Sequence, residues 1–497
     1  MTGAPLPVRV APEELAGTVA AEVGRGGRFV ALIGRARDDG STALHAVVAG
    51  GRRLTTIATE LSPGVSSYPA LTPLVPAAAW YEREVHDLFG VVPSGHRRLD
   101  PLVLPLTEAA VRPRPGAAQG PTRVELDVAG LPSHVMGEGV FTIPYGPVRS
   151  GVFESVQYLV ETVGEEIPHV RTRVYHKHRG IERRFQELSP ADGVLLAERI
   201  EGTAAVAHAL AFCQALEAPA GTAVPWRAAL LRVVHAELER ITTHLDSVLR
   251  HTEGAGQAVA NARLAVDKER LMRLRARLCG HRFGRGVIVP GGTSGPPALA
   301  PANALAELDT LARALRDDLD ALMATPSFLD RLRGTGIVPG DEARAHGALG
   351  PVGRGSGLTE DVRAERPYGA YGSLGFDVST GHPEGDALAR QRVRLDEIVQ
   401  SIHLTREALD ELDEAGDGPW RVDAPLVDGI SVTSVEAPQG ELLYFVETVE
   451  GRLARVKPRT ASFHNLALFP EAFRGDIFTD FVFIEASFGV SMAGVSG

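Results

Sequence analysis

Cysteine and lysine are both scarce in this sequence of 497 residues, which contains two cysteines and only three lysines among 51 basic residues. Cys213 and Cys279 lie far apart and fit no metal-ligand spacing. A thiolate-held iron–sulfur cluster normally takes four cysteines, so we expect no such cluster in this chain alone. We interpret the two cysteines as buried, inert thiols in a reducing cytosol, and the preference for arginine as genome base composition.

Long apolar runs are absent as well. No run approaches the roughly 18 apolar residues of a membrane-spanning helix, and the first ten residues lack the basic start and apolar stretch of a secretory signal. We therefore expect no direct membrane span, so that partner subunits would hold the chain at any membrane. The net charge of −11 argues against nucleic acid as a partner, although a local basic patch is compatible with that average.

Composition and apolar spacing divide the chain into three parts. The length is too great for one core and fits two or three domains. Residues 1–103 are predicted to form a small α/β domain, and residues 104–135 a linker rich in proline and glycine. Residues 136–497 are predicted to be mainly helical with small β elements. The expected fold class is therefore α+β.

The apolar periodicity places individual elements in both domains. In the first domain, helices are expected at Pro12–Val23 and Ala77–Leu88, and strands at Arg28–Arg35 and Leu44–Ala49. In the second domain, we expect strands at Gly139–Pro144 and Ser155–Val163 and long helices at Ala228–His251, Ala258–Cys279, Asn303–Thr325 and Asp386–Glu414. Residues 334–385 are glycine-rich and are expected to be irregular. Residues 429–466 alternate with period two around Gly440, which is typical of a hairpin.

The segment from Trp80 to Gly90 combines acids, bases and aromatic residues: it reads Trp-Tyr-Glu-Arg-Glu-Val-His-Asp-Leu-Phe-Gly and is followed by Gly95-His96. It resembles the signature of the 30-kilodalton or C subunit of respiratory complex I, which also occurs fused in membrane-bound hydrogenases. Taken alone, the run is equally compatible with a solvated, charged helix face that forms its own ion pairs.

The chain from about Gly146 to its end resembles the 49-kilodalton or D subunit of complex I and the large subunit of energy-converting hydrogenases. The matching segments follow the family's order: Gly146-Pro147, Gly164–Glu166, His178–Glu182, Glu237–Ile241 with His244, Gly334, Gly350–Gly357, Asp361–Arg363, Pro367-Tyr368, Gly385-Asp386, Glu436–Pro438, Ser462-Phe463 and Asn465-Leu466. Both signatures in one chain resemble the fused C/D arrangement of formate hydrogenlyase large subunits.

The sequence departs from this family where the family's chemistry lies. Residues 197–208 and 483–494 resemble the two cysteine motifs that hold nickel and iron in hydrogenases, but the four thiolate positions contain Glu201, Ala204, Ser491 and Gly494. A carboxylate, a methyl group, a hydroxyl and a hydrogen cannot replace soft thiolates at nickel. The resemblance therefore implies the scaffold without a metal bound by this chain.

The quinone ligands of complex I are missing too. In that family the same cavity binds the quinone headgroup, which a tyrosine and a histidine contact. The tyrosine position contains Gly202, and the histidine position contains Phe153, with Arg149 at a nearby family histidine. Neither set of reactive groups is therefore present.

Four candidate site residues remain around these positions: Arg179, Glu182, Glu201 and His208. In the family, the arginine of the His-Arg-Gly motif, here Arg179, sits beside the iron–sulfur cluster of a partner subunit, and the following glutamate, here Glu182, conducts protons. Seven residues separate Glu201 from His208, so on a helix they would share one face and could form a buried proton relay with Glu182. Alternatively, they are buried polar groups satisfied by Arg179 and Arg199.

Two further patterns carry less chemistry. His176 and His178 flank Lys177, but no further ligands stand at a metal-binding spacing. Gly350–Gly357 lacks the Gly-Lys-Ser/Thr of a phosphate-binding loop, and we interpret it as a structural loop that lets backbones approach closely. No segment has the pattern of a nicotinamide nucleotide site.

These observations lead to two hypotheses. The first is a subunit of an NADH-dehydrogenase-like or hydrogenase-4-like complex, peripheral on the cytoplasmic face of the membrane, with an iron–sulfur small subunit and antiporter-like integral membrane subunits as partners. It would pass electrons from the partner's cluster to a quinone or another small acceptor, with no cofactor bound by this chain alone. The second is a non-catalytic structural or coupling subunit with a vestigial cavity. A free-standing soluble enzyme is a third, weaker interpretation, because no nucleophile or cofactor motif supports it.

Overall fold

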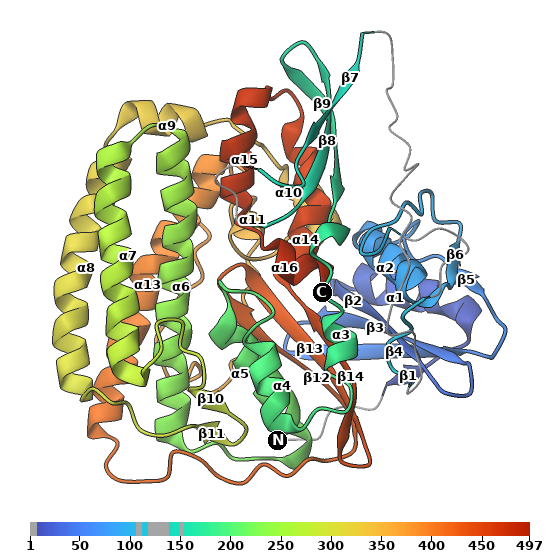
Figure 1. Ribbon diagram of the computed structural model, residues 1–497, viewed down its shortest axis with the longest axis horizontal. Helices are drawn as coiled ribbons and strands as arrows, with labels where there is room; N and C mark the ends of the chain where they lie inside the picture. The colour runs from blue at the N-terminus through green and yellow to red at the C-terminus, as the bar shows by residue number, and fades with distance from the viewer. Residues whose placement is uncertain (1–6, 106–111, 118–138, 150–153) are drawn as a thin grey trace.

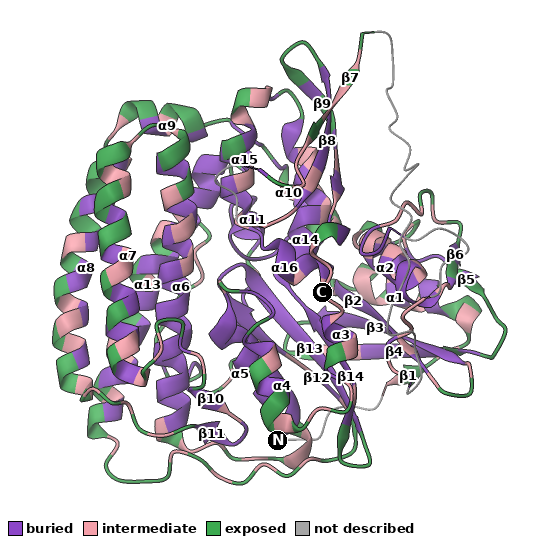
Figure 2. Ribbon diagram, viewed as in Figure 1, coloured by how far each residue is buried: buried purple, intermediate pink, exposed green. Residues whose placement is uncertain are grey.

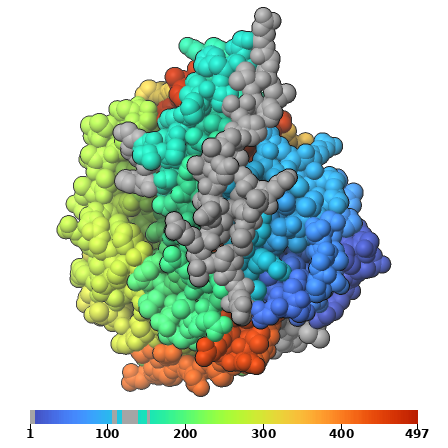
Figure 3. Space-filling view, turned by 45° about the vertical axis from the view of Figure 1, so that its right-hand side comes forward, coloured from blue at the N-terminus to red at the C-terminus, as the bar shows by residue number. Residues whose placement is uncertain are grey.

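The computed structural model describes residues 7–105, 112–117, 139–149 and 154–497. Figure 1 shows a bundle of long helices, a central three-stranded sheet, and an N-terminal unit on the far side of that sheet. Turned by 45°, Figure 3 shows the β7–β9 region between the bundle and the N-terminal unit. The mixture of a small α/β unit with a mainly helical region confirms the predicted α+β class.

The N-terminal unit is built on a four-stranded sheet of order β1-β4-β3-β2. Its strands are β1 (Val8–Arg9), β2 (Arg28–Ala36), β3 (Thr42–Gly50) and β4 (Arg53–Leu61), and its helices are α1 (Leu15–Gly24) and α2 (Ala79–Phe89). Short parallel strands β5 (Ser67–Pro69) and β6 (Val92–Ser94) form a second sheet. The two predicted helices and two predicted strands are confirmed, whereas β4 was missed because its threonines interrupt the apolar pattern.

The helix α2 carries the Trp80–Gly90 segment, and its acids are not solvated. Glu82, Glu84 and Asp87 are 0%, 5% and 2% exposed. Glu82 accepts hydrogen bonds from the backbone of Leu71 (2.7 Å) and Thr72 (2.9 Å), and Asp87 accepts from three consecutive N–H groups that begin at Leu102. The interpretation as a solvated, charged helix face is therefore wrong.

Four long helices form the bundle: α6 (Trp226–Gly254), α7 (Ala258–Cys279), α8 (Pro301–Met323) and α13 (Ala387–Glu414). All four predicted helices are confirmed to within a few residues. The helices α6 and α13 are buried along most of their length, while α7 and α8 present exposed faces to the outside (Figure 2). A cluster of leucines, valines and isoleucines from all four helices forms the core between them.

The central sheet is an antiparallel meander of β12 (Gly429–Ala437), β13 (Gly440–Val449) and β14 (Arg452–Arg459). The predicted hairpin around Gly440 is confirmed as β12–β13, and the prediction missed that β14 adds a third strand. Helix α5 (Ala205–Ala220) packs on one face of this sheet through apolar residues. The sheet thus stands between α5 and the N-terminal unit, where Arg455 of β14 donates to the Gly34 carbonyl (3.0 Å).

A third sheet comprises β7 (Phe141–Tyr145), β8 (Gln157–Val163) and β9 (Glu166–Arg173). The first two strands agree with the predicted ones, and the third was missed because Glu166–Arg173 alternates poorly. Aromatic side chains pack β8 onto α15 (Phe481–Phe488), with Tyr158 in edge contact with Phe481 at 5.1 Å. This sheet therefore joins the C-terminal helices to the rest of the chain.

The region 334–385, predicted to be irregular, contains three short helices: α10 (Gly340–Ala345), α11 (Gly350–Arg354) and α12 (Val362–Glu365). Another short helix, α9 (Pro326–Leu332), precedes this region. The stretch Gly350–Gly357 begins with a helix and is not the loop expected. Gly350 has φ +58°, and a Cβ there would lie 2.1 Å from the Gln439 carbonyl oxygen. The expected close approach of backbones is confirmed.

Most of the predicted linker 104–135 lies outside the described residues. Of its described residues, 104–105 and 112–117, the second stretch is attached to the N-terminal unit, because Arg114 donates to the Leu88 carbonyl (2.9 Å) and Ala36 donates to the Pro115 carbonyl (3.0 Å). The division into three parts stays a prediction. Among the described helices, none combines the length and apolar character needed to cross a bilayer.

Candidate functional site

Of the four positions that the resemblance assigns to hydrogenase thiolates, the structure brings Glu201 against Gly494. Glu201 and Ala204 follow α4 (Pro190–Ala197), and Ser491 and Gly494 lie at the start of α16 (Met492–Ser496). Arg179 links the two segments: its guanidinium donates to the carbonyls of Arg199 (3.0 Å), Ile200 and Ala493 (3.2 Å). The candidate Arg179 thus holds these two backbone segments together through hydrogen bonds. Its side chain is half-buried, so part of it remains accessible.

Glu201 and His208 are paired, but for a different reason from the one predicted. Helix α5 begins at Ala205, so Glu201 precedes the helix and does not share its face. His208 Nε2 lies 3.1 Å from Glu201 Oε1, and its Nδ1 lies 2.7 Å from the Tyr444 hydroxyl of β13. All three side chains are buried. The result is a hydrogen-bonded chain of a carboxylate, an imidazole and a phenol, whose third member sequence reasoning missed.

The Glu201 carboxylate fills space beside Gly494. A Cβ at position 494 would lie 2.5 Å from Glu201 Oε2, which is closer than real Cβ contacts. Ala204 is fully buried, and Ser491 donates to Glu154 Oε1 (3.0 Å). The side chains at the four positions therefore pack against neighbours and do not converge on a common point.

This donor set does not fit a soft-metal centre, because it provides no thiolate or imidazole pair at the four positions. Among the residues that the structure describes, no group of three or more histidine, cysteine or acidic side chains is arranged to hold a metal ion. We therefore derive no chemistry through a metal at this position.

The alternative pairing with Arg179 and Arg199 stays a prediction: the Arg179 charge attracts the Glu201 carboxylate, but among the described residues neither arginine forms a direct hydrogen bond or ion pair with it. Arg179 donates to carbonyl oxygens, and Arg199 is an exposed residue whose guanidinium lies 3.6 Å from Glu198. Glu201 Oε2 is buried and receives no hydrogen bond from the described residues. Among the described residues, His208 is therefore the hydrogen-bond partner of this carboxylate, through Oε1 alone.

We expect Gly494→Ala to destabilise the protein by about 1–3 kcal/mol, because the new methyl group collides with Glu201 Oε2 in a packed interior. The double variant Glu201→Ala/Gly494→Ala removes the collision partner and should lose less than the sum of the two single changes. Urea unfolding of the four proteins measures this coupling. Strictly additive losses would contradict the proposed contact.

Glu182 belongs to a separate cluster. It pairs with Arg455 (2.5 Å) and Lys457 (2.6 Å), and Lys457 also pairs with Glu84 of α2 (2.6 Å). Burial alone would raise the pKa of Glu182, but Arg455 and Lys457 lower it to about 2. Burial raises the pKa of Glu84 to about 7, against the effect of Lys457. Among the described residues, no hydrogen bond or ion pair joins Glu182 to Glu201 or His208, so the structure does not assemble the expected three-member relay.

This cluster connects both signature segments of the chain. Glu84 lies in the Trp80–Gly90 segment and Glu182 in the His178–Glu182 segment, and Lys457 of β14 bridges them. One of only three lysines in the sequence thus holds a fully buried bridging position. The rarity of lysine was the only feature of the sequence that pointed to Lys457.

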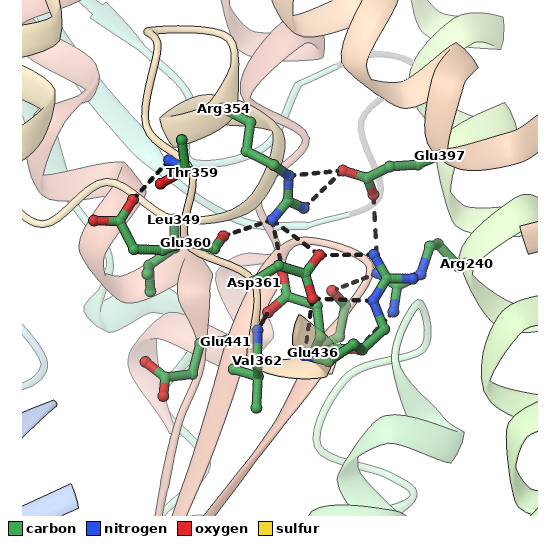
Figure 4. Close-up of polar contacts among 12 residues, drawn as sticks. Arg240, Leu349, Arg354, Thr359, Glu360, Asp361, Val362, Glu397, Glu436 and Glu441 are labelled. Atoms are coloured by element: carbon green, nitrogen blue, oxygen red, sulfur yellow. Dashed lines mark hydrogen bonds and ion pairs between the residues drawn. The ribbon is translucent and has the colours of Figure 1, made fainter. Parts of the chain in front are cut away.

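A larger buried network lies between α6, α13 and β12 (Figure 4). Arg354 donates to Glu397 (2.6 Å) and Glu436 (3.1 Å) and lies 3.3 Å from Asp361. Arg240 and Arg363 add further contacts to Glu237 at 3.0 and 3.3 Å. Most of these residues lie in the segments that carry the resemblance. In the sequence, only the charges of these residues indicated that they could form a buried network.

Glu239 of α6 lies behind the Glu201–His208 pair. Its carboxylate accepts hydrogen bonds from the Val206 (2.7 Å) and Ala207 (2.9 Å) N–H groups at the start of α5. Burial raises the pKa of Glu239 to about 7, with a smaller upward contribution from Glu201. Glu239 thereby fixes the helix start that positions His208, and sequence reasoning did not single it out as a site residue.

The remaining candidates have structural surroundings. His178 Nδ1 lies 2.6 Å from the Ser496 carbonyl, and the His176 ring packs on Tyr175 at 4.6 Å. Cys213 is fully buried, which raises the pKa of its thiol, whereas Cys279 is only partly buried. Phe153 lies outside the described residues, and Arg149 pairs with Glu485 at 2.7 Å.

Comparison with protein families gives two matches. The family described as "Respiratory-chain NADH dehydrogenase, 49 Kd subunit" matches residues 256–428 and 425–496, and the family described as "Respiratory-chain NADH dehydrogenase, 30 Kd subunit" matches residues 31–125. The order of the two matches is the order of the two signature segments in the chain.

Three curated proteins illustrate the similarity. The carbon monoxide-induced hydrogenase of Rhodospirillum rubrum is 32% identical over 332 residues, which cover 65% of this chain and 90% of that protein. The alpha subunit of the membrane-bound hydrogenase of Pyrococcus furiosus is 31% identical over 363 residues, with 69% and 84% covered. The C/D subunit of the NADH-quinone oxidoreductase of Rhodopseudomonas palustris is 31% identical over 400 residues, with 76% and 66% covered.

Proposed function

Because the chain belongs to the family of the 49- and 30-kilodalton subunits of respiratory-chain NADH dehydrogenase and the related hydrogenase subunits, we propose that it passes electrons within a membrane-associated complex. The electrons would come from an iron–sulfur small subunit and go to a quinone or quinone-like acceptor. Antiporter-like and other integral membrane subunits would hold the chain at the cytoplasmic face of the membrane. The name of the Rhodopseudomonas palustris relative supports a quinone as the acceptor.

The observation that carries the metal-free part of this proposal is the position of Glu201. Its carboxylate lies where an added side chain at position 494 would be, and the four thiolate positions contain no sulfur. Nickel and iron need soft thiolate ligands in such a site. A small organic acceptor is therefore the better candidate than protons reduced at a metal.

The chain Glu201–His208–Tyr444 supplies the proton chemistry in this proposal. Reduction of a quinone to a quinol consumes two protons, and a buried imidazole between a carboxylate and a phenol can hold and pass a proton. Arg179 would lie beside the partner's cluster, and its hydrogen bonds hold the backbone at Ile200 and Ala493 around the acceptor. Glu182 would serve a second proton route through Lys457 and Glu84.

A non-catalytic coupling subunit is the second candidate, and one observation favours it. The space beside Glu182, Lys457 and Gly494 amounts to only ≈10 Å³, so this part of the ancestral position is filled by side chains. In that case the buried charges would transmit conformational change between the N-terminal unit and the membrane subunits.

Isosteric substitution distinguishes the two candidates in the complex purified in mild detergent from the native membranes. Glu201→Gln keeps the shape of the side chain but removes its charge, and His208→Gln removes the imidazole. Under the electron-transfer proposal each should lower quinone reductase activity by at least about 100-fold. Glu269→Gln, at an exposed ion pair with Arg273, is the matched control.

Three results would contradict the proposal: one concerns the activity of the variants, one the metal content, and one the subunits that purify with the chain. Unchanged activity of both variants, in complexes that retain all their subunits, would favour the coupling role. Stoichiometric nickel in the purified complex, assigned to this chain by metal analysis, would overturn the metal-free acceptor site. Recovery of the chain without an iron–sulfur partner would in addition remove the basis for electron transfer altogether.

A further inference from the structure

A cavity of ≈460 Å³ lies between α6, α7, α13 and the segment 489–491, next to the candidate site. Gly202 and Ser491 belong to its wall, so it borders the ancestral metal position from the side of the helical bundle. Ion pairs and exposed charges lie toward the bundle surface, where Lys268 pairs with Asp246, and Arg250 and Glu253 are exposed. A concave site with a few convergent polar groups is the usual form of a small-molecule site.

The wall of this cavity contains a buried arginine that has no carboxylate partner in the part of the chain that the structure describes. Arg394 of α13 is 3% exposed, and among the described residues its only hydrogen bond runs from Nη1 to the Arg390 carbonyl (3.1 Å). No described carboxylate lies within 4 Å of its guanidinium. Its Nη2 lies against Gly489 of the cavity wall, where an added Cβ would be 2.9 Å away.

This state differs from that of the neighbouring buried arginines. Arg390, one turn earlier on α13, donates to Ser487 (2.9 Å) and to the carbonyls of Gly385 (2.6 Å) and Gly336 (2.8 Å). Arg354 contacts three carboxylates. A guanidinium has five N–H donors, and leaving a buried charge unpaired is unfavourable. Arg394 therefore has donors available for something that occupies the cavity.

The cavity also contains unused acceptors. His244 Nε2 lies 2.8 Å from Glu397, and burial lowers the pKa of His244 to about 4, so the ring is neutral and Nε2 donates. Its Nδ1 is then an acceptor, and it has no partner among the described residues. Gln439 donates through Nε2 to Thr203 (3.0 Å), while its buried Oε1 receives no hydrogen bond from them. A ligand that carries a hydroxyl group could satisfy either acceptor.

The described carboxylates that line the cavity, Glu154, Asp246 and Glu253, form no ion pair with Arg394. Glu154 accepts hydrogen bonds from the Ser491 hydroxyl (3.0 Å) and from the Met492 N–H, and Asp246 is paired with Lys268. Glu397 of α13 contacts Arg354 and His244 directly and acts on the Arg394 charge only from a distance. Arg394 thus presents a positive charge to the cavity without a direct carboxylate contact among the described residues.

We propose that this cavity binds a small hydroxylated carboxylate, whose carboxylate pairs with Arg394 and whose hydroxyl donates to His244 or Gln439. A guanidinium forms bidentate pairs with carboxylate and phosphate groups, and we commit to the carboxylate, with phosphate as the comparison in the test. This site does not depend on the electron-transfer function, because it rests on Arg394 and on the unpaired atoms around the cavity. Its failure and that of the proposed function are therefore separable.

The test compares lactate with propionate, which differ by one hydroxyl group, and with inorganic phosphate. Thermal unfolding of the full chain, or of the complex that contains it, is followed at increasing concentrations of each anion. A ligand that binds only the folded state raises the unfolding temperature. We expect lactate to raise it by several degrees at saturation, and propionate and phosphate to act only at roughly tenfold higher concentration at equal ionic strength.

The variant Arg394→Met provides a second readout that a purely structural arginine would not give. Removal of an unpaired buried charge should leave the ligand-free protein as stable as the parent or more stable, and should abolish the effect of lactate. Arg392→Met, on the same helix, should respond to lactate like the parent.

Three results would overturn the proposal. The first is an absence of any shift with lactate in the parent protein. The second is an equal shift with lactate in the parent and in Arg394→Met. The third is an unfolding temperature of ligand-free Arg394→Met that lies markedly below that of the parent, which would show that Arg394 already has a stabilising partner.

Discussion

Replacement of Arg354 by methionine is expected to lower the free energy of unfolding by about 5 kcal/mol or more, the upper end of the range for broken buried ion pairs. Arg354 is 1% exposed and contacts Glu397, Glu436 and Asp361, as Figure 4 shows. Methionine has similar length but no charge, so three buried carboxylates would lose their common partner. Such a loss is comparable to the whole stability of many domains.

Urea unfolding followed by circular dichroism measures this effect, with soluble yield as the readout if the variant does not fold. Arg406→Met is the matched control, because Arg406 forms a half-exposed pair with Asp309 at 2.6 Å and exposed pairs contribute less than about 1 kcal/mol. The double variant Arg354→Met/Glu436→Leu should recover part of the loss. A small effect of Arg354→Met, similar to that of the control, would show that Arg240 and Arg363 already neutralise the network.

Lys457→Met is expected to cost about 3–5 kcal/mol at pH 7, because it leaves Glu84 and Glu182 buried with Arg455 as their remaining cation. The loss should include docking of the N-terminal unit, since Lys457 joins α2 to β14. Limited proteolysis and unfolding by urea would detect both effects. Lys177→Met is the control, because Lys177 has no ion pair among the described residues.

The same variant has a defined pH dependence. In the parent, Glu182 has a pKa of about 2, so its contribution is fully present above pH 4.5 and is lost only as the pH falls toward 2. Without Lys457, burial raises the folded-state pKa of both glutamates, and the folded variant binds more protons than the folded parent. The deficit in stability should therefore shrink as the pH falls from 7 to 5. A deficit that stays constant over this range would contradict the proposed pairing.

Local periodicity was sufficient to locate most of the long elements. The helices α6, α7, α8 and α13 repeat apolar residues every three to four positions over many turns, and that pattern depends only on neighbouring residues. Strands with interrupted alternation, β4 and β9, were missed because their pairing with adjacent strands compensates for a weak local pattern. Helix α11 was missed because its glycines and proline disfavour a helix in isolation.

The candidate site was only partly accessible from the sequence. The absence of thiolates at positions 201, 204, 491 and 494 is a property of residue types and can be read directly. The pairing of Glu201 with His208 was anticipated from a spacing of seven on one helix, yet the helix begins after Glu201. The sequence analysis thus predicted the correct pair of residues, but from the incorrect assumption that both lie on one helix. Tyr444 completes the chain from a strand 236 positions away, which no spacing rule could indicate.

By itself the sequence determined the class of fold, the long helices and the chemical types available at each position, since these depend on composition and on short-range periodicity. Only the tertiary structure decided which charges meet: Lys457 with Glu84 and Glu182, Arg354 with Glu397, and Arg394 with no described carboxylate at all. The physical reason is that a buried charge interacts with whatever the fold brings within about 4 Å. That proximity is set by the packing of distant segments and leaves no trace in local spacing.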